Sequence, residues 1–60
     1  MEAELNYYRR RSVEESKAAA ESPDGKIRGI HLELERRYDE KISAIEAELR
    51  RGQMHLIATV

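Results

Sequence analysis

Two tyrosines followed by three arginines, at residues 7–11, form the cluster in this sequence with the clearest capacity for binding chemistry. Arginine pairs with phosphates and tyrosine stacks on bases, so Arg9, Arg10 and Arg11 are candidate nucleic-acid contacts. Helical spacing weakens this interpretation, because Arg10 and Arg11 should point outward toward Glu14 and Glu15 one turn away, which partly neutralise them. We favour an amphipathic helix edge, with arginine stems over apolar surface and a tyrosine pair in a packed seam.

His31 and Glu35 lie one helical turn apart, a spacing that can hold a metal ion from one face of a helix. Two ligands do not make a site. The motif of di-iron helical bundles is also absent, because Arg28 occupies the position where its glutamate would be. We therefore interpret His31 as a partly buried residue hydrogen-bonded to Ser16 or to a carboxylate, and expect no metal site and no cofactor.

No residue pattern in the sequence predicts catalysis. The serines at positions 12, 16, 22 and 43 are scattered without a nucleophile elbow, and a glycine-rich phosphate loop is missing. The acidic and basic side chains follow the spacing of a solvated helix surface. We expect no catalytic residue and no enzymatic activity.

The composition limits what the chain can be. Its 60 residues make one small domain at most, with marginal stability from its own core. It has 0 cysteines, which excludes a disulfide or thiolate metal site as a support. The 11 basic and 12 acidic residues are interleaved, which gives no general support to nucleic-acid or membrane binding. Without a signal segment or an apolar membrane span, we expect a cytoplasmic protein.

Two helices joined by one turn should position these residues, so the sequence predicts an all-α fold. We expect a helix over residues 2–21, a turn over 22–25 and a second helix over 23–51, together an antiparallel hairpin domain of residues 1–52. The apolar tail 53–60 has no clear pattern, and we expect it either to dock on a partner or to fray.

The ends of the second helix follow from residues that favour helix caps. Ser22 can accept an orphan backbone N–H at the N-cap, and Pro23 fits the first helical position. Arg50 and Arg51 complement the negative end of the helix dipole, and Gly52 suits the left-handed position that follows a helix. These residues predict that the helix stops near Arg51.

An apolar stripe with steps of three and four runs along the second helix and predicts that one face of it is buried. The spacing is close to the repeat of a coiled coil. Leu32 projects well away from this face. The stripe consists of Ile27, Ile30, Leu34, Tyr38, Ile42, Ile45 and Leu49.

Small residues near the turn on the first helix should meet large residues on the second. We expect Val13 to lie near Leu34, and Tyr8 near Tyr38. The inward face of the first helix is expected to carry Met1, Leu5, Tyr8, Ser12, Val13, Ser16, Ala19 and Ala20.

The two helices differ in length, and this difference carries the functional prediction. The start of the first helix should lie opposite about Glu46 of the second, and apolar positions of the second helix continue beyond Glu46. The C-terminal end of the second helix therefore has no cover within its own chain. Twofold pairing of two hairpins into a four-helix bundle is the simplest way to cover it; a partner protein with an apolar groove is the alternative. The expected homodimer interface consists of Tyr38, Ile42, Ile45, Leu49 and Met54.

The predicted function is therefore that of a small structural or protein-interaction module that self-associates through its second helix. A nucleic-acid-binding regulator that uses residues 7–11 is the alternative. We expect no membrane partner.

Part of the sequence resembles a pattern found in short bacterial helical-hairpin proteins of no known activity. The resemblance covers about the first two thirds of the chain. It implies a small bacterial intracellular protein and transfers no site residue. It rests on the two tyrosines and three arginines of residues 7–11, followed after a proline-containing turn by His31, Leu32, Glu33, Leu34, Arg37 and Tyr38.

Overall fold

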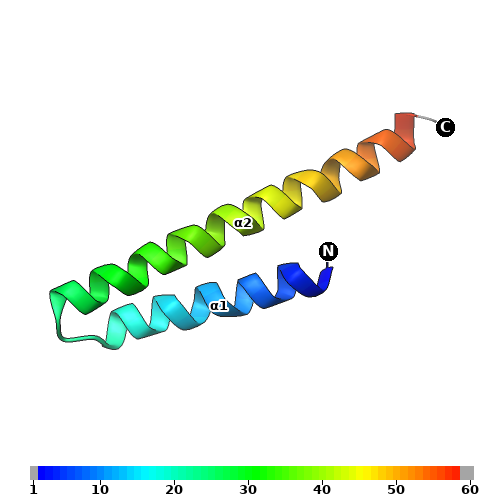
Figure 1. The fold of residues 1–60 in the computed structure, drawn as a ribbon. Coiled ribbons are helices and arrows are strands. Elements are labelled where there is room, and N and C mark those ends of the chain that lie inside the picture. The colour runs from blue at the N-terminus through cyan, green and yellow to red at the C-terminus, as the bar shows by residue number, and fades with distance from the viewer. Residues whose placement is uncertain (1, 59–60) are drawn as a thin grey trace.

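The computed structural model describes the backbone of residues 2–58 and the side chains of residues 2–52. Helix α1 (Glu2–Glu21) and helix α2 (Gly25–Ala58) lie antiparallel and side by side, in a rod of 55 × 16 × 12 Å (Figure 1). The chain is thus an all-helical hairpin, and α1 has the bounds that the sequence predicts. Neither helix, within the described residues, combines the length and apolar character needed to cross a bilayer.

Helix α2 begins two residues later than predicted, because Asp24 caps it in place of Ser22. The Asp24 Oδ1 atom accepts the backbone N–H of Lys26 at 2.8 Å, and its carbonyl oxygen accepts that of Arg28 at 2.9 Å. The Ser22 hydroxyl instead donates to the Asp24 carbonyl at 3.2 Å, and Pro23 lies in the turn. Aspartate is as good an N-cap as serine and also places a negative charge at the positive end of the helix.

The predicted stop of α2 at Arg51 is wrong. The helical backbone continues through Gly52, which has no positive φ, to Ala58. The glutamine, methionine, leucine and alanine that follow favour a helix, and together they offset the cost of about 1 kcal/mol for one glycine. The predicted tail 53–60 therefore belongs to α2 as far as Ala58. The side chains of this segment, including Met54, lie outside the described residues.

Replacing Gly52 with Ala should stabilise the chain by about 0.5 to 1 kcal/mol, because alanine has the higher helix propensity. A Cβ atom added at this position meets no other atom within 4 Å. Urea unfolding followed by circular dichroism measures the change. Gly52→Asn is the matched comparison, since asparagine tolerates the left-handed conformation of a C-terminal cap. An asparagine variant more stable than the alanine variant would show that α2 ends at this glycine.

The interior between the two helices is small and partly polar. Among the described residues, the buried apolar ones are Leu5 and Ala19, and the buried polar ones are Ser12 and Glu15. These four residues follow a heptad-like spacing and therefore share one face of α1. One hairpin thus buries little apolar surface for its length.

Helix α1 is rotated relative to the predicted packing. Val13 is 68% exposed, and Ser16 and Ala20 are also exposed, whereas Ser12 and Ala19 are buried as predicted and Glu15 is buried beside them. The prediction that this face covers the start of the apolar stripe is therefore wrong. Ile27 and Ile30 are 48% and 59% exposed. The rotation follows from hydrogen bonds between buried polar residues of α1 and partners on α2, described below.

Farther from the turn, the predicted contact between Tyr8 and Tyr38 is present. The ring centroids of Tyr8 and Tyr38 are 6.0 Å apart. Ile42, Ile45 and Leu49 are half-buried. The apolar stripe of α2 is therefore partly buried in this part of the molecule and exposed to solvent near the loop that joins the helices.

Candidate functional site

Polar side chains from both helices meet in the middle of the hairpin, and we call this group the polar seam. It consists of Arg11, Ser12 and Glu15 of α1 and His31 and Asp39 of α2. Ser12 Oγ donates to Asp39 Oδ1 at 2.6 Å. Glu15 Oε1 lies 2.7 Å from His31 Nδ1, and Glu15 Oε2 accepts from Arg11 Nη2 at 3.0 Å. Because a carboxylate can only accept, His31 Nδ1 carries the hydrogen.

Glu15 is the most deeply placed charge of the polar seam, with 6% of its surface exposed. The hydrogen bond from His31 lowers the pKa of Glu15 below its ordinary value of 4.5; the charges of His31 and Arg11 act in the same direction, and burial opposes them. The carboxylate is therefore ionised at neutral pH. Every buried side-chain nitrogen and oxygen in the described part of the chain has a hydrogen-bond partner.

The connections within the polar seam differ from those of a serine nucleophile. Such a nucleophile needs a histidine base hydrogen-bonded to its hydroxyl. Here the Ser12 hydroxyl donates to Asp39, whereas His31 is bonded to a different carboxylate, that of Glu15. This arrangement joins α1 to α2 and fixes their relative rotation.

His31 has the hydrogen bond to a carboxylate that the sequence predicts, and its partner is Glu15 of α1. Ser16, the other predicted partner, is not the residue that His31 contacts. No group of three or more histidine, aspartate or glutamate side chains that could hold a metal ion occurs within the described residues.

The first two arginines of residues 7–11 contact carboxylates. Arg9 Nη2 lies 3.0 Å from Glu46 Oε2 across the hairpin, and Arg10 Nε lies 3.9 Å from Glu14 Oε1. A phosphate would have to compete with these ion pairs. A nucleic-acid contact through the segment stays a prediction without further support from this geometry.

Arg11 contacts the carboxylates of Glu14 and Glu15 that the sequence predicts as its neighbours, at 3.3 and 3.0 Å. Its side chain is nevertheless half-buried rather than turned outward, and it lies over Tyr38, with the guanidinium carbon 5.6 Å from the ring centroid. The physical reason is the rotation of α1, which turns this flank toward α2. Arg11 therefore belongs to the polar seam, where it has a structural role.

The predicted interface residues are partly covered within one hairpin. Tyr38, Ile42, Ile45 and Leu49 are each half-buried, so each keeps apolar surface that another chain could cover. The fifth, Met54, lies in the segment whose side chains are outside the described residues.

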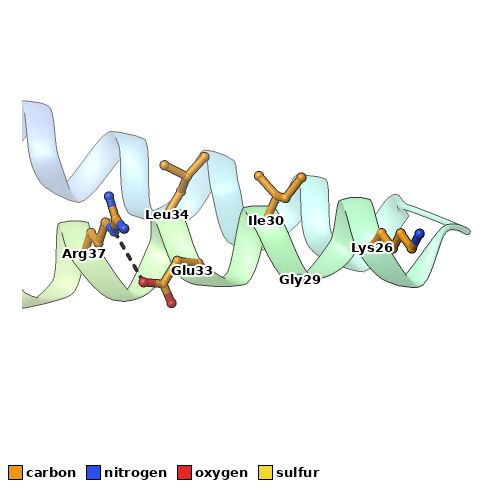
Figure 2. Close-up of a pocket in the computed structure, with 6 residues that line it drawn as sticks. All are labelled: Lys26, Gly29, Ile30, Glu33, Leu34 and Arg37. Carbon is orange, nitrogen blue, oxygen red and sulfur yellow. Dashed lines mark hydrogen bonds and ion pairs between the residues drawn. The ribbon is translucent and has the colours of Figure 1, made fainter.

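A second apolar surface lies on α2 next to the turn, and we call it the turn-proximal face. It consists of Ile27, Ile30 and Leu34, of which Leu34 is half-buried and the other two are exposed. Figure 2 shows Ile30 and Leu34 projecting from the same side of α2. They border a surface hollow of about 540 Å³, all of whose lining residues belong to α2: Lys26, Gly29, Ile30, Glu33, Leu34 and Arg37.

Sequence reasoning did not single out Glu15 or Asp39, and it placed the turn-proximal face inside the hairpin. One signal was available. Glu15 lies at heptad-like spacing from Leu5 and Ala19, on the face opposite His31, so a carboxylate and an imidazole could be expected to meet there. The apolar side chains of Val13 and Ala20 and the small side chain of Ser16 outweighed this signal.

No family model, curated protein or solved structure was found to match this chain. The resemblance to bacterial helical-hairpin proteins therefore stays a prediction. The functional argument depends on the geometry of the hairpin alone.

Proposed function

We propose that this chain is a small protein-interaction module that pairs with a second copy of itself through α2, so that two hairpins form a four-helix bundle. The observation that carries the proposal is the difference in length between α2, with 34 residues, and α1, with 20. Arg9 already contacts Glu46, and the end of α2 extends well past the start of α1 (Figure 1). That end needs cover from another chain.

The exposed area of the hairpin supports a second copy as this cover. A compact folded chain of 7.0 kDa exposes about 4,000 Å², whereas this one exposes 4793 Å². The excess of roughly 800 Å² is what one partner buries in a protein interface of standard size. A dimer would thus bring each chain to the exposed area of a compact domain.

The residues expected at the centre of the interface are Tyr38, Ile42, Ile45 and Leu49. Complete burial of an isoleucine or leucine side chain stabilises by about 1.5 to 3 kcal/mol, and these side chains are half-buried in one hairpin. The polar seam limits what each hairpin gains alone, because it occupies much of the space between α1 and α2. Pairing adds the apolar burial that the single hairpin lacks.

Size-exclusion chromatography with light scattering tests the proposal. We expect a mass of about twice 7.0 kDa at micromolar concentration, and a thermal unfolding midpoint that rises with protein concentration. A folded monomer at micromolar concentration, with a midpoint independent of concentration, would contradict the proposed function.

A further inference from the structure

We infer that the turn-proximal face is a docking surface for the far end of α2 from a second copy of this chain. In this antiparallel arrangement, Ile30 lies opposite Leu49 of the second copy, and Leu34 lies opposite Ile45 of the second copy. The inference rests on the proposed function and specifies which surfaces meet.

The turn-proximal face is open because α1 does not cover it. Ile30 is 59% exposed and Ile27 is 48% exposed, although both continue the apolar stripe of α2. Isolated exposed apolar residues are ordinary, but here Ile30 and Leu34 together line a hollow of about 540 Å³ (Figure 2). A contiguous apolar surface beside a hollow is suited to receive side chains of another helix.

A separate hollow lies farther along α2 toward its far end, and we call the two hollows together the groove. A second hollow, of about 230 Å³, is lined by Glu4, Tyr8, Lys41, Ala44 and Ile45. At 3.6 residues per turn, Ile30, Leu34, Lys41 and Ile45 fall within a sector of about 60°, so both hollows open on the same side of α2. From Ile30 to Ile45 this groove is about 22 Å long, enough for four turns of a helix.

The spacing of apolar residues favours a second copy as the occupant. Ile30 and Leu34 are separated by one helical turn, as are Ile45 and Leu49. An antiparallel pair of α2 helices can therefore match both contacts at once, and twofold symmetry repeats them at the other end. The same arrangement covers the part of α2 that extends past α1, and it accounts for the excess exposed area.

Two cations along the groove already have partners within one chain. Arg37 Nε lies 3.3 Å from Glu33 Oε1, and Lys41 Nζ lies 5.5 Å from the centroid of the Tyr8 ring. A second copy carries the same charges, so repulsion between cations of the two chains is a concern. Because Arg37 and Lys41 already have partners in their own chain, this repulsion is reduced. The apolar contacts decide the affinity.

Ile30→Glu tests the inference, because Ile30 is exposed in one hairpin and the carboxylate would be desolvated only in the dimer. We expect the dimer dissociation constant, measured by analytical ultracentrifugation, to rise about 10- to 100-fold. Leu32→Glu is the matched control. Leu32 is 49% exposed, lies on the same helix and projects from the opposite side, so its variant should dimerise like the unsubstituted chain.

Disulfide cross-linking provides a second test that does not depend on the folding of a charged variant. The sequence has 0 cysteines, so chains carrying Ile30→Cys and chains carrying Leu49→Cys can be mixed and oxidised gently. We expect the mixed disulfide to form at least about 10 times faster than either symmetric one. The reason is that two copies of position 30 would lie about 28 Å apart, beyond disulfide reach.

The outcomes separate this inference from the proposed function. A dimer that Ile30→Glu leaves intact, or one that favours a symmetric disulfide, would overturn the inference while the proposed function stands. An unsubstituted chain that remains monomeric at every concentration would overturn both, and the groove would then be left to a partner of a different kind.

Discussion

Replacing Ile42 with Asp is expected to abolish the helical circular dichroism signal of the chain at 25 °C. Ile42 is half-buried against α1, and the substitution removes its apolar contacts and places a charge beside Asp39 and Glu46, each about one turn away. The combined cost of about 3 kcal/mol or more is comparable to the whole stability of a 60-residue domain, which is about 3 to 9 kcal/mol. The measurement is the mean residue ellipticity at 222 nm, with a urea titration.

Ser43→Asp is the matched control for this prediction. It introduces the same charge one residue further along α2, at an exposed position, and should change the stability by about 0.5 kcal/mol or less. If Ile42→Asp kept its helicity and its urea midpoint, the apolar stripe would not hold the hairpin together. Ile45→Asp should behave like Ile42→Asp, because Ile45 is half-buried on the same face.

Local sequence signals were sufficient to predict the hairpin itself. The turn lies where the proline and glycine of residues 22–25 interrupt two long helical patterns, and α1 occupies Glu2–Glu21 as expected. The contact between Tyr8 and Tyr38 follows from antiparallel packing with a short turn, which fixes the pairing along the helices. Length and turn position therefore predict which residues lie level with each other.

The rotation of α1 could not be predicted from apolarity. Val13 is apolar yet 68% exposed, whereas the ionisable Glu15 is 6% exposed. A ranking by hydrophobicity would bury Val13 and expose Glu15. Such a ranking treats the burial of a carboxylate as a cost and ignores the hydrogen-bond partners that offset this cost. Arg11 lies one turn away on α1 and can be identified from the sequence, whereas His31 comes from α2, so its contact with Glu15 depends on how the two helices pack.

To predict the ends of α2, one must choose between residues with nearly equal preferences for the capping positions of a helix. Ser22 and Asp24 are both good N-caps, and the difference between them is smaller than sequence reasoning can resolve. At the other end, Gly52 can terminate a helix or be tolerated inside one. The helix-favouring residues after it decide the outcome, and α2 runs on to Ala58.

Replacing Glu15 with Gln is expected to destabilise the chain by about 1 to 2 kcal/mol at pH 7, which lowers the unfolding midpoint by about 4 °C or more. Glutamine keeps the shape of the side chain but removes the charge that His31 and Arg11 contact at 2.7 and 3.0 Å. Both partners are themselves partly exposed, which limits the loss. Thermal unfolding of the two proteins, compared over a range of pH, measures the effect.

The difference in stability between the Glu15→Gln variant and the unsubstituted chain should disappear in acid. The direction of this pH dependence follows from the pKa of Glu15. Because the folded chain lowers this pKa below 4.5, the charged carboxylate stabilises the fold above pH 4.5, and this contribution is lost as the pH falls through the lower folded-state value. Glu14→Gln is the matched control. The Glu14 carboxylate is 51% exposed, so the Glu14→Gln variant should lose about 0.5 kcal/mol of stability or less. A Glu15→Gln variant as stable as the original at pH 7 would show that the buried carboxylate does not hold α1 in its observed rotation.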